Sequence, residues 1–246
     1  MKHKQTVRIF SHQTDLITAA AELFIQAANE SVAQNGRFLT ALSGGGTPQA
    51  LFEQLATPAY ASQIDWQRSH ILWGDERLVP PNDSGSNYKL AWDTLLAHIP
   101  IPPQNIHRAK GELDPETAVA DYTQQLQQLA LPGQTLPTLD LALMGVGSDG
   151  HTASLFPGPI PAAEQSQPVI AVTADYNGRP AGRISLTPLV FNAARHILFL
   201  VTGAKKAAAL AAVLNHQDSP ETWPAQRIQP TNGTITWLVD EAAAGK

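Results

Sequence analysis

Residues 38–48 read FLTALSGGGTP, and this stretch decides the fold. The apolar run 38–42 predicts a buried strand, and three glycines follow it at 44–46. A helix is expected to start next, with Thr47 as its N-cap and Pro48 at the first helical position. A strand, a tight turn and a helix form the repeating unit of α/β proteins, so the rest of the chain is expected to alternate in the same way.

The alternation continues along the chain. Short apolar runs predict strands at 7–10, 38–42, 70–73, 139–144, 169–173, 183–186, 196–201 and 234–239. Helical spacing predicts helices at 15–35, 115–131, 188–195 and 204–215. It also predicts one helix that starts at residue 48 and another that ends near residue 98. Thr14 is expected to cap the first helix and Gly36 to end it. The pattern favours an α/β fold of the doubly wound, Rossmann-like type, a mostly parallel sheet with helices on both faces.

The Pro-rich pieces at 80–81, 100–103 and 157–161 interrupt this pattern without a lasting change in composition. They are typical of stiff loops rather than of linkers, so residues 1–246 are expected to form a single domain. In such folds ligands bind at the carboxyl ends of the strands.

The composition of the chain argues against several classes of function. The 246 residues include no cysteine, which excludes disulfides and thiol chemistry. Lys and Arg number 16 against 21 Asp and Glu, and the net charge of −5 argues against nucleic acid or an anionic membrane as the main partner. The N-terminus lacks the apolar stretch of a signal peptide, and the longest aliphatic or aromatic run is only 197–201. We expect a soluble, cytoplasmic protein that is a monomer or a weak homo-oligomer.

The first glycine loop is a candidate phosphate site. Ser43, Gly44, Gly45 and Gly46 lie between a strand and a helix, where backbone N–H groups and the helix N-terminus attract an anion. The alternative is a tight turn that binds nothing. Ser43 also resembles the nucleophile of a G-x-S-x-G elbow, but Ala41 replaces the first glycine.

The second glycine loop is LALMGVGSDGHTASLFPG, residues 141–158. Its glycines formally match a dinucleotide motif, and Asp175 sits at a tolerable distance for the acidic residue of that motif. However, three prolines after residue 156 cut short the helix that the motif needs. His151 is a candidate general base, because a neutral imidazole can take and return a proton near pH 7. The alternative is a buried or capping histidine. No metal-binding motif is present around it.

Polar residues form two further candidates. Asp75, Glu76 and Arg77 follow a predicted strand and could hold a hydroxylated substrate or a developing oxyanion, or else form a solvated turn. Arg183 and Lys206 would supply the positive charge that a phosphate needs in an acidic protein. Otherwise they point into water.

Taken together, the motifs resemble those of the 6-phosphogluconolactonases in the glucosamine-6-phosphate isomerase superfamily. SGGGTP, GDER, SNY, GVGSDGHTASLFPG, RISLT and GAKKA occur in the family's order and cover nearly the whole chain. The resemblance implies a doubly wound α/β fold and hydrolysis of 6-phospho-D-glucono-1,5-lactone to 6-phosphogluconate in the oxidative pentose phosphate pathway. It also implies that neither a metal nor an organic cofactor takes part.

The sister family, the glucosamine-6-phosphate deaminases, is the nearest alternative. Those enzymes resemble this chain in the glycine loop, the acidic pair and Asp-Gly-His, but they carry a carboxylate where this chain has Phe156 and tend to carry Tyr in place of Arg77. Ring opening needs the extra carboxylate, whereas lactone hydrolysis needs one base and an oxyanion partner. Both departures favour the lactonase.

The resemblance implies roles for the candidate residues. The phosphate is expected on Ser43 and Gly44–Gly46 with Arg183 and Lys206, and the catalytic set is His151, Asp149, Arg77 and Asp75. Whether Asp149 orients His151 or only shapes its loop stays open, as does the division of phosphate and carbonyl contacts among Arg77, Arg179 and Arg183. A non-catalytic sugar-phosphate-binding domain and a serine esterase built on Ser43 are the remaining alternatives.

Overall fold

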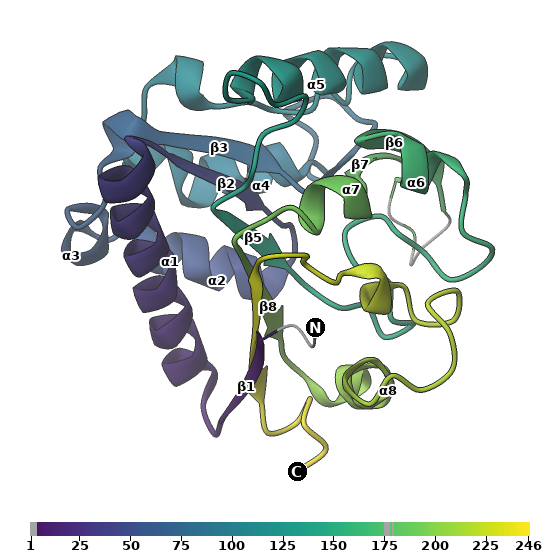
Figure 1. Cartoon of the computed structure of the whole chain (residues 1–246). Helices are drawn as coiled ribbons and strands as arrows, with labels where there is room; N and C mark the ends of the chain where they lie inside the picture. The colour runs from purple at the N-terminus through teal and green to yellow at the C-terminus, as the bar shows by residue number, and fades with distance from the viewer. Residues whose placement is uncertain (1–3, 175–177, 179) are drawn as a thin grey trace.

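A computed structural model describes residues 4–174, 178 and 180–246 of the chain. Within these residues a 6-stranded sheet has the order β1-β9-β8-β5-β2-β3, and all neighbouring strands are parallel (Figure 1). The strands are β1 (Lys4–Phe10), β2 (Phe38–Leu42), β3 (Ser69–Trp73), β5 (Leu141–Met144), β8 (His196–Val201) and β9 (Thr234–Asp240). Strands from both ends of the sequence therefore belong to one sheet.

Helices cover both faces of this sheet, as Figure 1 shows. One face packs on α1 (Gln13–Asn35), α2 (Gly46–Leu55), α3 (Pro58–Ala61) and α4 (Asn87–Thr94). The other packs on α5 (Pro115–Leu129), α7 (Pro188–Phe191) and α8 (Ala207–Leu214). In β8 the alternation is direct: Leu198 and Leu200 belong to the first core, Phe199 and Val201 to the second. The predicted doubly wound α/β fold is confirmed.

Short elements join these layers. They are α6 (Ala163–Ser166) and the 3₁₀ turns η1 (Trp66–Arg68), η2 (Leu96–His98), η3 (Pro103–Asn105), η4 (Ala204–Lys206) and η5 (Pro224–Arg227). The predicted helix at 204–215 is thus a 3₁₀ turn followed by α8, and the one at 188–195 ends at Phe191.

A second sheet was not predicted. It is antiparallel and has the order β4-β7-β6, formed by β4 (Asp75–Arg77), β7 (Gly182–Leu186) and β6 (Val169–Thr173). Gly74 joins the two sheets, because its N–H donates to the carbonyl of Leu42 while its own carbonyl accepts from the N–H of Leu186. The chain therefore turns away from the parallel sheet just after β3 and places Asp75–Arg77 in a new layer.

Two predicted caps are wrong. The N-cap of α1 is His12, and Thr14 lies inside the helix. The N-cap of α2 is Gly45, with φ of 110°, and Thr47 lies in the first turn. Its hydroxyl oxygen lies 2.7 Å from that of Thr202, a long-range partner that replaces the expected cap. Gly36 ends α1 in the left-handed region with φ of 75°, as predicted.

No helix in the described part of the chain has both the length and the apolar character needed to cross a membrane.

Candidate active site

Four parallel strands end at one cleft. The loops that follow β2, β3, β5 and β8 supply its walls, and its volume is about 330 Å³. The predicted residues that line it are Ser43, Gly44, Gly45, Gly46, Asp75, Arg77, His151, Arg183 and Lys206. Asp149 does not line the cleft, but its carboxylate forms a hydrogen bond to the ring of His151. The structure thus brings all the predicted site residues together, except Arg179, which lies outside the described residues.

His151 is held by Asp149. Its Nδ1 atom lies 2.6 Å from Oδ1 of Asp149, and its backbone N–H donates to the same oxygen at 3.1 Å. Burial raises the pKa of Asp149, but the hydrogen bond and the charge of His151 leave that pKa below its usual value. An ionised carboxylate only accepts hydrogen bonds, so Nδ1 carries the proton. Asp149 therefore forms hydrogen bonds both to the loop backbone and to the ring of His151.

Gly147 makes room for this pair. A Cβ atom at this position would overlap Nδ1 of His151 and Oδ1 of Asp149. The N–H of Gly147 also donates to the carbonyl of His151 at 2.7 Å, which closes the loop. A glycine here is required by the close approach of the two side chains.

The ring of Phe156 lies next to both His151 and Arg183. Its ring centroid is 4.9 Å from that of His151, and the guanidinium carbon of Arg183 lies 5.5 Å from the Phe156 centroid. The carbonyl of Phe156 accepts from Nη2 of Arg227, which forms a buried ion pair with Glu164 at 3.0 Å. The backbone of Phe156 is thus anchored to a buried ion pair that lies outside the cleft.

The first glycine loop faces the cleft with the N-terminus of α2. The first turn of a helix leaves backbone N–H groups without intrahelical acceptors, and the helix dipole adds positive charge there. Arg183, 3% exposed, and Lys206 line the same cleft. Lys205, the neighbouring lysine, lines it as well. The cleft therefore combines backbone donors with these cationic side chains, which suits a phosphate.

Asp75 lines the same cleft and is almost fully buried. Its Oδ2 accepts from the hydroxyl of Ser154 at 2.7 Å, and its Oδ1 accepts from Nδ2 of Asn87 at 3.3 Å. Arg77 also lines the cleft, and its Nη1 donates to the carbonyl of Gly85 at 2.6 Å.

Sequence reasoning gave no role to Asn87. This residue lines the cleft, is 3% exposed, and donates from Nδ2 to the carbonyl of Asp75 at 2.8 Å. A Cβ at Gly44 would overlap its amide oxygen, so Asn87 also packs on the first glycine loop. The SNY motif was the available signal, because it places an amide at the start of the helix that follows GDER. Ser154 and Thr202 are further residues at the site that the sequence analysis did not single out.

Among the described residues, no group of three or more His, Cys, Asp or Glu side chains is arranged to hold a metal ion.

Comparisons with known proteins show the family to which the chain belongs. The sequence matches the family described as glucosamine-6-phosphate isomerases/6-phosphogluconolactonase over residues 11–237. It is 38% identical to the 6-phosphogluconolactonase of Nostoc sp., over 99% of this chain and 98% of the relative. The solved structure of the 6-phosphogluconolactonase from Trypanosoma brucei is similar with a TM-score of 0.86 and 26% identity, over 99% of each chain.

A monomeric glucosamine-6-phosphate deaminase is also similar, with a TM-score of 0.83 and 22% identity, over 98% of this chain and 99% of that one. This likeness concerns the fold alone. The overall architecture therefore does not separate the two activities, and the side chains in the cleft must do so.

Proposed function

This chain belongs to the family of glucosamine-6-phosphate isomerases and 6-phosphogluconolactonases, and from that premise we propose that it is a 6-phosphogluconolactonase. It hydrolyses 6-phospho-D-glucono-1,5-lactone to 6-phospho-D-gluconate, a step of the oxidative pentose phosphate pathway. The single observation that carries the proposal is that His151, hydrogen-bonded to Asp149, lines a cleft that the first glycine loop also lines.

The groups at the proposed phosphate end of the cleft suit a dianion. Backbone N–H groups of Gly44–Gly46 and the hydroxyl of Ser43 face the phosphate, while Arg183 and Lys206 supply positive charge. Arg183 is nearly excluded from water, so its attraction to an anion is screened less than that of a surface arginine. The phosphate fixes the lactone with its carbonyl toward His151, and Asp75 and Arg77 contact the sugar end.

The reaction then needs one base and one oxyanion partner. Nε2 of His151 removes a proton from water, and the water oxygen bonds to the lactone carbonyl carbon. Arg77 or a loop N–H stabilises the negative charge on the carbonyl oxygen. The tetrahedral intermediate collapses, the bond from the carbonyl carbon to the ring oxygen breaks, and that oxygen takes the proton back from His151. Asp149 stabilises the charged imidazole between the two transfers.

Deamination of glucosamine 6-phosphate is the second candidate. The ring of Phe156 contacts that of His151 in a tilted arrangement, at the position where the deaminases carry a carboxylate, and an apolar ring cannot move protons during ring opening. This contact favours the lactonase. A non-catalytic sugar-phosphate-binding domain would not need a His–Asp pair held at 2.6 Å in its ligand cleft.

The test is lactone disappearance, corrected for spontaneous hydrolysis, with unphosphorylated gluconolactone as the control substrate. We expect the wild-type protein to prefer the phosphorylated lactone, and His151→Ala to lower kcat about 10²–10⁴-fold because a general base contributes on that scale. His98→Ala, at an exposed histidine on the surface, is the matched control. Ammonia release from glucosamine 6-phosphate, or a His151→Ala variant with the wild-type rate, would overturn the proposal.

The wider setting is also proposed. Residues 1–246 act as one domain, which the pairing of β1 with β9 supports because it joins the two ends of the sequence. We expect a cytoplasmic protein that works as a monomer or a weak homo-oligomer, without nucleic acid or membrane partners; its net charge of −5 favours a small anionic substrate met by local positive groups over a polyanionic surface.

A further inference from the structure

Glu76 is a buried carboxylate beside the cleft that the mechanism above does not use. It lies on β4 between Asp75 and Arg77, and it is 2% exposed. Its Oε1 accepts from the backbone N–H groups of Arg77 and Asn87, both at 2.7 Å. Its Oε2 accepts from the hydroxyl of Ser86 at 2.9 Å and from the N–H of Tyr88 at 2.7 Å.

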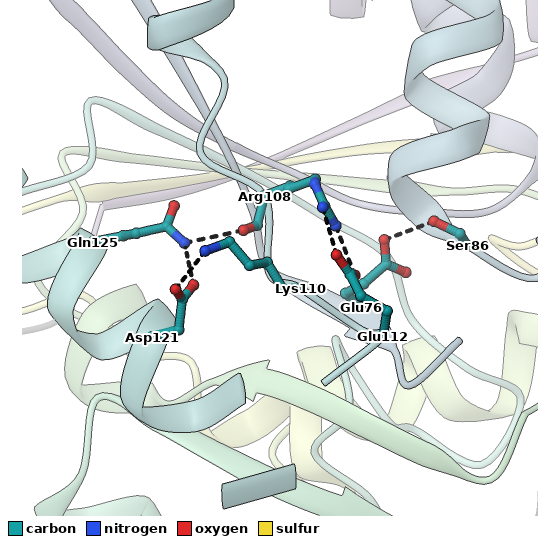
Figure 2. Close-up of polar contacts among 7 residues, drawn as sticks. All are labelled: Glu76, Ser86, Arg108, Lys110, Glu112, Asp121 and Gln125. Atoms are coloured by element: carbon teal, nitrogen blue, oxygen red, sulfur yellow. Dashed lines mark hydrogen bonds and ion pairs between the residues drawn. The ribbon is translucent and has the colours of Figure 1, made fainter. Parts of the chain in front are cut away.

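The partners of this carboxylate are all donors. Three of them are backbone N–H groups, two of which belong to the first turn of α4, where a negative charge is favourable. Figure 2 shows the Glu76 carboxylate pointing at Ser86, next to Arg108, which forms its own ion pair with Glu112 at 2.6 Å. Burial raises the pKa of Glu76, and the four hydrogen bonds oppose that rise. A carboxylate matches this set, because it accepts at both oxygens and donates at neither.

Glu76 reaches the cleft through Asn87. The same residue whose N–H is held by Glu76 donates from its side chain to the carbonyl of Asp75 at 2.8 Å and to Oδ1 of Asp75 at 3.3 Å. The amide oxygen of Asn87 packs against Gly44 of the first glycine loop. The buried carboxylate of Glu76 therefore fixes the backbone of Asn87, and the side chain of Asn87 contacts Asp75.

We propose that Glu76 is a positioning residue for the sugar end of the substrate: its carboxylate fixes Asn87, and Asn87 fixes Asp75 in the cleft. This inference rests on the proposed function, in which Asp75 contacts the sugar. Phosphate binding depends on the backbone of Gly44–Gly46 and on Arg183 and Lys206, none of which bonds to Glu76 among the hydrogen bonds of the described residues. Asn87 packs on Gly44 through its amide oxygen but forms hydrogen bonds to Asp75, so a change at Glu76 should affect the sugar end of the ligand more than the phosphate end.

The experiment compares Glu76→Gln with wild type by calorimetry, using 6-phosphogluconate and inorganic phosphate as separate probes. The glutamine amide has nearly the same shape but presents N–H groups to backbone N–H donors at one of its two positions. Hydrogen bonds to charged groups contribute on a scale that converts to about tenfold or more in affinity. We expect 6-phosphogluconate to bind about tenfold more weakly and phosphate to bind within about twofold of wild type.

Glu112→Gln is the matched control, since it makes the same chemical change at a nearby but partly exposed acid that pairs with Arg108. It should change neither affinity by more than about twofold. Asn87→Ala tests the route: the double variant with Glu76→Gln should bind 6-phosphogluconate as weakly as Asn87→Ala alone, because coupled residues are not additive.

If Glu76 only stabilises the first turn of α4 and does not influence the site, the binding results would differ from those expected above. Equal losses for both probes, a lower Tm with both affinities unchanged, or additive effects of Glu76→Gln and Asn87→Ala would each overturn the proposal. If Glu76→Gln does not fold, Glu76→Asp keeps the charge on a shorter side chain and must show the same selective loss. Turnover of the lactone is measured in parallel, so that an inactive wild-type protein refutes the proposed function while the two probes still decide the role of Glu76.

Discussion

Nδ1 of His151 lies 2.6 Å from Oδ1 of Asp149, and the same oxygen accepts the backbone N–H of His151. The carboxylate therefore receives two hydrogen bonds from one residue, which fixes the ring and keeps the Nδ1 proton in place. The lone pair that can act as a base is then on Nε2. Catalysis by His151 should depend on Asp149 even though Asp149 does not line the cleft.

Asp149→Asn should lower kcat about 10²–10⁴-fold with little change in the binding of inorganic phosphate. The neutral amide can turn its N–H groups toward Nδ1, which moves the ring proton to Nε2 and removes the base. Steady-state rates on the lactone and a phosphate titration measure the two effects. Asp65→Asn, at an exposed ion pair with Arg68, is the control and should retain the wild-type rate. Wild-type kcat in Asp149→Asn would exclude an orienting role.

Gly147→Ala should inactivate the enzyme without changing either catalytic side chain. The added methyl group would overlap both members of the His–Asp pair, so the imidazole must leave its position. At Gly145, in the same loop, a Cβ would meet only the carbonyl of Leu200 at 3.9 Å among the nearby described atoms. We expect a kcat loss of about 10²-fold or more for Gly147→Ala, approaching loss of the base, and a small change for Gly145→Ala. Equal rates for the two variants would contradict the steric argument.

The location of the site could be predicted because it follows from the sheet. Parallel strands all point their carboxyl ends to one edge, so residues after four predicted strands had to meet there. This is why Ser43, His151 and Lys206 are found in one cleft although they are far apart in sequence.

What escaped prediction depends on long-range partners. Thr47 has the local pattern of an N-cap, but Thr202 from another loop binds its hydroxyl. Asp75–Arg77 has the pattern of a strand end, yet Gly74 redirects it into a second sheet by bonding to Leu42 and Leu186. Local patterns do not contain these contacts, and the role of Asn87 was missed for the same reason.

Glu164→Gln should strongly destabilise the fold. Glu164 and Arg227 are each 4% exposed, so removal of one charge leaves the other buried without compensation, at a cost of about 3–5 kcal/mol. Glu112→Gln removes a partly exposed pair with Arg108 and should cost about 1 kcal/mol or less. Urea unfolding at pH 7 measures both. A similar decrease in the free energy of unfolding in the two variants would contradict the prediction that breaking the buried Glu164–Arg227 pair costs more than breaking an exposed one.

A pair of histidines far from the catalytic loop should make stability depend on pH. Nδ1 of His70 lies 3.1 Å from Nε2 of His107, and the rings stack with centroids 5.4 Å apart. Burial, together with the charges of His70 and Arg37, lowers the pKa of His107 to about 4. Burial and Arg37 also lower the pKa of His70.

The sign of the effect follows from these pKa values. Between the unfolded value near 6.5 and about 4, the unfolded chain binds a proton at His107 that the folded protein does not bind, so acid favours unfolding. The contribution is fully present above about pH 6.5 and is lost as the pH falls toward 4. We expect the free energy of unfolding, from urea titrations at pH 7, 6 and 5, to fall less steeply in His107→Gln than in wild type. His98→Gln, at an exposed histidine, is the control and should keep the wild-type slope. An unchanged slope in His107→Gln would mean that other groups carry the acid sensitivity of the fold.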